Sequence, residues 1–119
     1  MNQLSIIVDS VDTVGPIRSQ LAGLFESRLI SRRSLAAAPS TQFAYVDIDL
    51  ADHSDFFDLR HWLKAPPKNR ICVFAIDKGV RQQVVQACAL GATDLVMRPV
   101  DGKALLNSLL GDFDALIRE

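Results

Sequence analysis

Residues 89–101 read ALGATDLVMRPVD and contain the end of one helix, a turn, a short strand and the start of another helix. Gly91 favours the left-handed conformation that ends many helices, and residues 95–97 form an apolar run too short for a helix. Asp101 is a typical N-cap residue for the leucine-rich stripe that follows it. This order predicts that the C-terminal third contributes a strand between two helices.

Short apolar runs recur along the rest of the chain and give way to polar residues. They are only a few residues long and do not alternate apolar with polar side chains. Such runs are typical of parallel strands that are buried on both faces. The predicted strands are residues 4–8, 28–31, 43–46, 71–76 and 95–97.

Between these runs, apolar side chains recur at steps of three and four, which places them on one face of a helix. The first helix is predicted over residues 14–27, with Val14, Leu24 and Phe25 on its stripe. Residues 32–42 leave room only for a truncated or irregular second helix, because small and turn-forming residues dominate there. Later helices are predicted after Ser54, around Val80 to Cys88, and after Asp101.

Strands that alternate with helices predict a single α/β domain over residues 1–119. We expect a doubly wound, five-stranded parallel sheet with helices on both faces. Function in this fold class is sought beyond the carboxyl ends of the strands.

Composition excludes several functions. The 13 basic and 14 acidic side chains nearly cancel, so no excess positive field attracts nucleic acid or an anionic membrane. No apolar run approaches the roughly 20 residues that span a bilayer, and the polar start is not a signal peptide. The sequence therefore predicts a cytoplasmic protein, with Cys72 and Cys88 as buried, reduced thiols.

Aspartates follow three of the predicted strands. Because the carboxyl ends of parallel strands meet at one edge of a sheet, we expect these carboxylates to converge there. Asp47 directly follows an apolar run rather than opening a helix, which favours a reactive or metal-facing role. The converging residues are Asp9, Asp12, Asp47, Asp49 and Asp77.

The order of elements resembles the CheY-like receiver domain of bacterial two-component response regulators, a flavodoxin-like fold, over essentially the whole chain. Residues 89–101 are similar to the family's run of helix end, Gly-Ala turn, strand and Lys-Pro step. Residues 45–50, YVDIDL, resemble the segment with the phosphoacceptor aspartate, which maps to Asp47. The resemblance implies that a histidine kinase phosphorylates Asp47 with the help of magnesium, and that a distant surface then changes its partners.

The metal ligands depart from the family pattern. The family has two adjacent acids after the first strand, and here the pair is Asp9-Ser10, so the usual direct metal ligand is replaced by a hydroxyl. By resemblance, Asp9, Asp47 and the backbone carbonyl of Asp49 would bind Mg²⁺ only weakly. Asp12 could substitute only if its loop turned it inward.

The switch positions depart as well. Ala75 stands where the family has a threonine or serine that binds the phosphoryl group, and Leu95 stands where it has an aromatic residue. Arg98 replaces the lysine, and unlike lysine it can donate two parallel hydrogen bonds to a carboxylate. We expect Arg98 to form a standing ion pair with Asp47, and the Arg98-Pro99 bond to be cis as in the family.

Three functions stay open. The favoured one is an atypical receiver, or pseudo-receiver, without enzymatic activity, which serves as an interaction or dimerisation module because Ser10, Ala75 and Leu95 lack the switch chemistry. The second is a receiver that accepts phosphate at Asp47. The third is a flavodoxin-like enzyme or flavin carrier, but residues 10–16 place acids where its phosphate cradle would lie.

The predicted partners follow from the resemblance. They are a sensor histidine kinase or another signalling protein, and a C-terminal output domain if the chain is a fragment. A homodimer could form through the helix around Val80, the strand at 95–97 and the last helix, unless the leucine stripe packs on the sheet. Arg28, Arg32 and Arg33 are interpreted as a solvated loop, with a phosphate or kinase contact as the alternative.

Overall fold

The computed structural model describes residues 2–9, 15–54, 56–66 and 70–118. Its centre is a five-stranded sheet in the order β2-β1-β3-β4-β5, in which all neighbouring strands are parallel. The prediction of a doubly wound parallel sheet is therefore confirmed. The strands are β1 (Asn2–Val8), β2 (Phe25–Ser31), β3 (Phe43–Asp47), β4 (Ile71–Ile76) and β5 (Asp94–Met97).

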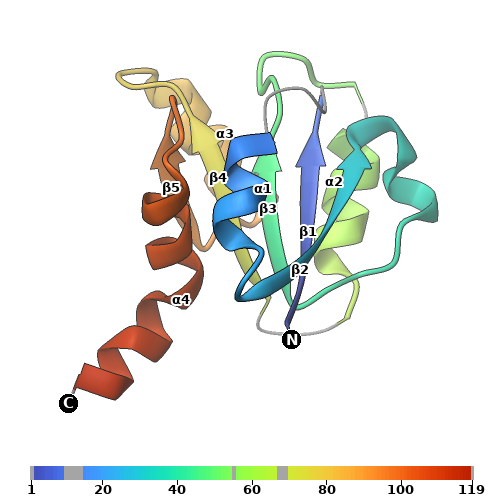
Figure 1. Ribbon diagram of the computed structural model, residues 1–119. Coiled ribbons are helices and arrows are strands. Elements are labelled where there is room, and N and C mark those ends of the chain that lie inside the picture. Colours follow the sequence, from blue (N-terminus) through green and yellow to red (C-terminus); the bar gives the residue numbers. More distant parts are fainter. Residues whose placement is uncertain (1, 10–14, 55, 67–69, 119) are drawn as a thin grey trace.

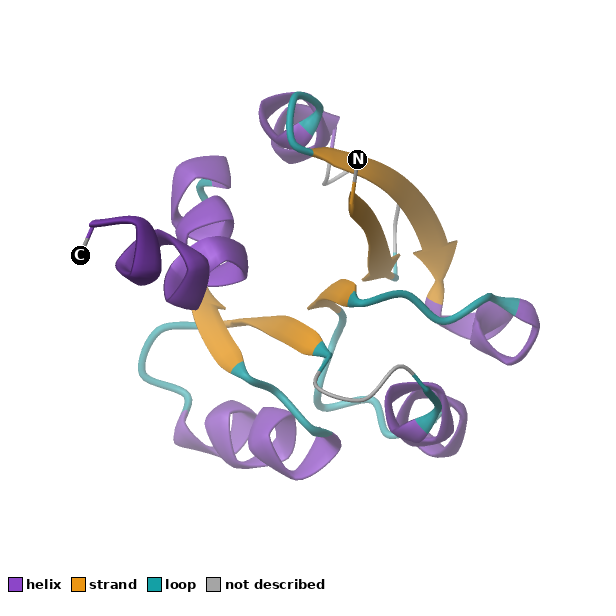
Figure 2. Ribbon diagram, turned by 90° about the horizontal axis from the view of Figure 1, so that it is seen from below, coloured by secondary structure: helices purple, strands orange, loops and turns teal. Residues whose placement is uncertain are grey.

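Helices cover both faces of the sheet (Figures 1 and 2). One face packs against α1 and α4 around Leu21 and Leu105, and the other against η2, α2 and α3 around Leu35 and Trp62. No helix in the described part of the chain is long and apolar enough to cross a membrane. The helices are α1 (Gly15–Leu21), the 3-10 helix η2 (Arg32–Ala37), α2 (Phe56–Lys64), α3 (Arg81–Leu90) and α4 (Gly102–Arg118).

The boundary between α1 and β2 differs from the prediction. The helix expected over residues 14–27 ends at Leu21, and the strand expected at 28–31 begins at Phe25. Leu24 is half exposed, whereas Phe25 is 2% exposed and packs edge-to-face on Phe43 with ring centroids 5.0 Å apart. Burial of Phe25 in the sheet outweighs a helical periodicity that this residue also satisfies. Val14 lies outside the described residues.

The second helix is truncated, as predicted. It consists of the six-residue 3-10 helix η2, with Leu35 buried against the sheet. The Ser31 hydroxyl accepts a hydrogen bond from the Arg33 backbone N–H at 3.3 Å, so the helix begins directly where β2 ends. The side chain of Arg32 is thereby placed close to the carboxyl end of the strand.

The prediction for the cysteines is half wrong. Cys72 is buried in β4, where burial raises the pKa of its thiol to about 12, but Cys88 is exposed on α3. The inward face of α3 is formed by Ala87 and Leu90, so Cys88 points away from the sheet. The helix ends at Gly91 with φ 114°, the left-handed geometry predicted for it.

The leucine stripe of α4 packs on the sheet. Leu105 and Leu109 are almost completely buried, and Leu106 and Leu110 are partly buried beside them. Asp101 caps the helix, because its Oδ1 accepts a hydrogen bond from the Lys103 backbone N–H at 3.3 Å. The side chains of the last part of the predicted stripe, residues 113–117, lie outside the described ones.

Candidate functional site

An open cavity lies where the parallel strands end, which we call the carboxyl edge of the sheet. β1 ends just before Asp9, β3 ends at Asp47 and β4 ends just before Asp77. Acids from three neighbouring strands are thereby brought together, as the order of strands and aspartates indicated. The cavity is lined by Asp9, Asp47, Ile48, Asp49, Asp77, Gln83 and Arg98.

Arg98 joins two of these acids. Its Nη2 lies 2.9 Å from Asp47 Oδ1 and its Nη1 lies 3.3 Å from Asp77 Oδ1, while Nη2 also donates to the Ile48 carbonyl at 2.8 Å. Burial opposes the charge on Arg98, but the carboxylates of Asp47 and Asp77 outweigh it and raise the pKa of the guanidinium. The expected ion pair with Asp47 is present, and the Arg98-Pro99 bond is cis.

The pairing differs in detail from two parallel hydrogen bonds. Nε of Arg98 donates at 3.0 Å to the same Oδ1 of Asp47 that Nη2 contacts. The other oxygen, Oδ2, accepts a hydrogen bond from the hydroxyl of Tyr45 at 3.2 Å. Both oxygens of Asp47 therefore have protein donors.

Tyr45 is a site residue that the sequence analysis missed. It lies two residues before Asp47 on β3, so the two side chains share one face of the strand. Its side chain is completely buried, and burial, then the negative charge of Asp47 and the hydrogen bond to it, raise the pKa of the phenol. The phenol therefore stays protonated and acts as a donor to Asp47.

Asp77 is held from its other side by Gln83 of α3. The Gln83 Nε2 donates to Asp77 Oδ2 at 2.9 Å, and its Oε1 accepts from the Asp77 backbone N–H at 2.6 Å. The hydrogen bond from Gln83, with a smaller contribution from Arg98, lowers the pKa of Asp77. The start of α3 is thus fixed to the end of β4.

Arg32 contradicts the interpretation of the arginine cluster as a solvated loop. Arg28 and Arg33 are exposed, but Arg32 is only 4% exposed and its Nη1 lies 3.3 Å from Asp9 Oδ1. Three of its other partners are backbone carbonyls of the loop after β3, those of Asp49, Asp52 and Ser54. A charge run does not reveal which side chain turns inward. The position of Arg32 directly after a strand was the available signal.

The carboxylates of Asp9 and Asp49 accept hydrogen bonds from backbone N–H groups of the loop that follows β3. Asp9 Oδ2 accepts a hydrogen bond from the Asp49 backbone N–H at 2.6 Å, and Asp49 Oδ1 accepts one from the Ala51 N–H at 3.0 Å. The Asp49 carbonyl, which the sequence analysis assigned to a metal, accepts instead from Arg32 Nη1 at 3.2 Å.

The arrangement of oxygen atoms at the carboxyl edge does not fit a magnesium ion. Mg²⁺ requires oxygen ligands in near-octahedral order, whereas the guanidinium groups of Arg32 and Arg98 occupy positions beside the oxygens of Asp9 and Asp47 where an ion would have to lie. Among the described residues, no group of three or more His, Cys, Asp or Glu side chains could hold a metal ion. The weak site expected from Asp9, Asp47 and Asp49 therefore does not match the arrangement. Ser10 and Asp12 lie outside the described residues.

The two described switch positions carry no polar side-chain group. Ala75 is 1% exposed and lies on β4 one residue beyond the pair formed by Val46 and Phe74, beside Asp47. Leu95 is half-buried against the core on the side of α2 and α3. Neither side chain can donate a hydrogen bond to an anion at the carboxyl edge.

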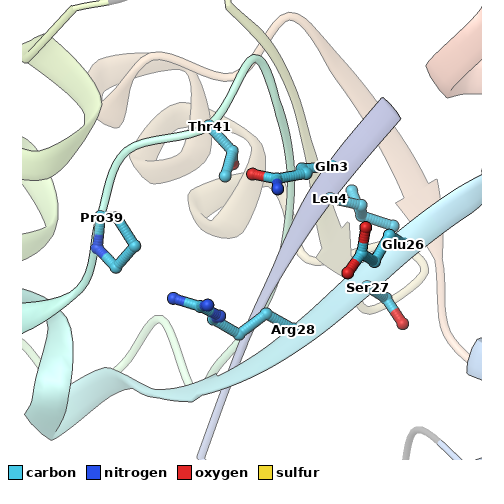
Figure 3. Close-up of a pocket in the computed structure, with 7 residues that line it drawn as sticks. All are labelled: Gln3, Leu4, Glu26, Ser27, Arg28, Pro39 and Thr41. Carbon is cyan, nitrogen blue, oxygen red and sulfur yellow. The ribbon is translucent and has the colours of Figure 1, made fainter. Parts of the chain in front are cut away.

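A second hollow lies toward the amino ends of β1 and β2 (Figure 3). Its polar groups serve the fold: the Thr41 hydroxyl lies 2.7 Å from that of Ser5 and donates to the Phe43 carbonyl at 2.8 Å. The Arg28 side chain extends from β2 into this hollow toward Pro39, and Glu26 is the acid among its lining residues. This hollow resembles the carboxyl edge neither in charge nor in geometry.

No protein-family model matches the sequence, and no curated protein is significantly similar to it. Solved structures nevertheless match almost the whole chain. CheY4, a chemotaxis protein of Vibrio cholerae, has a TM-score of 0.75 at 17% identity, with 93% of this chain and 98% of that chain covered. A CheY-like response regulator from Mesorhizobium loti has a TM-score of 0.66 at 18% identity, with 92% and 97% covered.

A longer protein matches over one part. The response regulator DrrB of Thermotoga maritima has a TM-score of 0.74 at 17% identity, and the match covers 97% of this chain but 54% of that one. The strand order and these similarities together establish the CheY-like receiver fold for this chain.

Proposed function

We propose that this chain is an atypical receiver domain of phosphorelay-type signalling, which acts as a non-enzymatic interaction module independently of phosphorylation. The observation that carries the proposal is the hydrogen bonding of the Asp47 carboxylate. Arg98 donates a hydrogen bond to one of its oxygens and Tyr45 donates one to the other. The proposal places the chain in the cytoplasm, with a histidine kinase or another signalling protein as its partner.

The chemistry of phosphoryl transfer supports this reading. A carboxylate that attacks phosphorus needs an oxygen lone pair within reach of the donor, and cations or hydrogen-bond donors must stabilise the transferred group. The side chain of Asp47 is 18% exposed and both of its oxygens already accept hydrogen bonds. Ala75 supplies no hydroxyl beside it.

Exposed apolar side chains support an interaction surface on the elements that the sequence analysis singled out. Val80 and Val85, at and within α3, are 40% and 59% exposed, and Met97 at the end of β5 is 56% exposed. Large apolar groups at the surface are typical of contacts with other proteins when they gather. We therefore include a homodimer, or an attached output domain, among the partners of this surface.

The alternative function is a receiver that accepts phosphate at Asp47. It is favoured by the gathering of Asp9, Asp47 and Arg98 at one edge, which keeps an acceptor, a second acid and a cation in place. The flavin-carrier alternative depends on residues 10–16, most of which lie outside the described residues.

Phosphorylation decides between the two receiver functions. The purified chain is incubated with acetyl phosphate and magnesium, and its intact mass is measured beside the Asp47→Asn variant. The proposal predicts that neither protein gains a phosphoryl group. A stable adduct on the wild type that Asp47→Asn removes would establish the alternative function instead.

A further inference from the structure

We propose that the guanidinium of Arg32 takes the place of a divalent cation at the carboxyl edge. It holds the Asp9 carboxylate and the Asp49 carbonyl together, so the wild-type chain does not take up magnesium. Loss of Arg32 should then make the site respond to a divalent ion. This inference rests on the proposed function, because it explains how the receiver fold keeps its acidic edge without a metal.

The geometry at Nη1 carries the inference. This one nitrogen lies 3.3 Å from Asp9 Oδ1 and 3.2 Å from the Asp49 carbonyl oxygen. A carboxylate oxygen and a backbone carbonyl oxygen are the two kinds of ligand that hard cations take from proteins. A positive group therefore already bridges the pair of oxygens that an ion would need.

The rest of the guanidinium holds the loop after β3. Its Nη2 donates to the Asp52 carbonyl at 2.8 Å and to the Ser54 carbonyl at 2.7 Å. The plane lies over the ring of Phe56, with Cζ 5.6 Å from its centre, at the start of α2. Burial of a charge is costly unless the charge is paired and hydrogen-bonded, and here both terminal nitrogens, Nη1 and Nη2, have such partners.

The truncated second helix explains how Arg32 reaches the site. η2 begins at Arg32 itself, immediately after the last residue of β2, and Leu35 anchors it to the core. The side chain therefore starts from the same edge of the sheet as the aspartates. The position at the start of an anchored helix therefore helps to keep the Arg32 side chain buried.

Local repulsion opposes a magnesium ion at the oxygens that the guanidinium groups already contact, although four carboxylates line the cavity against two arginines. Asp9 faces Arg32, while Asp47 and Asp77 face Arg98, so each of these three carboxylates already has a guanidinium partner. A magnesium ion would have to displace a guanidinium from its oxygens and then lie beside it, where like charges repel. We infer that the two arginines exclude the ion together and that Arg32 does so at the oxygens of Asp9 and Asp49.

The test compares the response of thermal unfolding to about 10 mM magnesium or manganese in three proteins: wild type, Arg32→Ala, and the matched control Arg33→Ala, which removes an exposed neighbour. Wild type and Arg33→Ala are expected to show no change in melting temperature. Arg32→Ala should melt lower without the ion and gain about 5 °C with it, as expected for millimolar binding. An equal gain in the wild type, or no gain in Arg32→Ala, would overturn the inference.

Two further measurements complete the test. The first locates the bound ion, and the second replaces the unfolding experiment if Arg32→Ala does not fold. Adding Asp9→Asn to Arg32→Ala should abolish the gain, and a gain that persists overturns the assignment to Asp9. If Arg32→Ala does not fold, Mn²⁺ is titrated into the labelled wild type: selective broadening of the amide signals of Asp9 and Asp49 contradicts the inference, and their persistence supports it. These readouts are separate from the phosphoryl mass of Asp47, so either proposal can fail alone.

Discussion

Two buried arginines stand at opposite ends of the strands and differ in one kind of partner. Arg32 at the carboxyl edge is 4% exposed and Arg70, just before β4, is 8% exposed. Both donate to several backbone carbonyls and both lie over an aromatic ring, that of Phe56 or Trp62. Arg32 alone of the two has an ion pair among the described contacts, with Asp9.

The ion pair distinguishes the roles of the two arginines. Arg70 stabilises the fold, whereas Arg32 also belongs to the candidate site at the carboxyl edge. Among the described residues, Arg70 donates hydrogen bonds to the carbonyls of Thr41, Trp62, Ala65 and Pro66, and burial lowers the pKa of its guanidinium. Arg70 thus holds the end of α2 at the start of β4, and within the described part of the chain no acid pairs with it. Arg32 does the same for the loop after β3 and, in addition, compensates a carboxylate at the edge where receiver chemistry would occur.

The largest expected effect is on stability at Arg70. Arg70→Ala leaves several carbonyls without their donor, and each such loss costs about 1 kcal/mol or more, so we expect the free energy of unfolding to fall by about 3 kcal/mol. Chemical denaturation followed by circular dichroism measures it, with the exposed Arg60→Ala as control. Magnesium should not restore stability to Arg70→Ala. A restoration equal to that of Arg32→Ala would erase the distinction between the two arginines.

A smaller effect is expected at Tyr45, the only tyrosine of the chain. Tyr45→Phe removes the hydrogen bond to Asp47 Oδ2 and should cost about 1 kcal/mol of unfolding free energy. The folded pKa of the phenol lies above its unfolded value, so this contribution is present below the unfolded pKa and is lost as the pH rises beyond it. Absorbance of the phenolate should therefore appear only as the protein unfolds, and titration of the folded chain near pH 10 would contradict the buried hydrogen bond.

The smallest effect concerns Asp77, whose carboxylate is exposed. Its folded pKa lies below the unfolded one, because of Gln83 first and Arg98 second, so its stabilising contribution is present above the unfolded pKa and is lost as the pH falls through the folded pKa. In Asp77→Asn, the free energy of unfolding should therefore fall slightly less than in the wild type as the pH drops below about 4. Denaturation midpoints at several acidic pH values measure it, and an unchanged acid profile would show that the pairs of Asp77 are not formed in solution.

Much of the fold could be predicted because the strands are nearly continuous apolar runs. β4 was predicted at its observed bounds and β3 to within one residue. The boundary between α1 and β2 was not, since Phe25 satisfies a helical stripe as well as a buried strand position. Local periodicity cannot decide whether Phe25 belongs to a helix or to a strand. Pairing of β2 with β1 does decide it.

The site was predictable only where its residues follow strands. Asp47 could be placed at the site because it comes at the end of a strand in a parallel sheet, and Arg98 could be paired with it because it stands where the resembling family has a lysine. Arg32 also follows a strand directly, but its inward turn could not be predicted, because most of its partners are backbone carbonyls, which leave no trace in the residue types. Tyr45 was missed although its spacing of two from Asp47 on a strand places both side chains on one face, because the direction of its hydroxyl depends on packing around β3.

The central claim is that two guanidinium groups and a phenol, rather than a metal and a phosphoryl group, satisfy the carboxyl edge. A crystal structure of the full chain grown with magnesium and a phosphoryl analogue tests it most directly. The account predicts Arg32 against Asp9 and Asp49, Arg98 and Tyr45 against Asp47, and neither ion nor analogue between them. A magnesium ion bound to Asp9 and Asp47, with the analogue on Asp47, would contradict it.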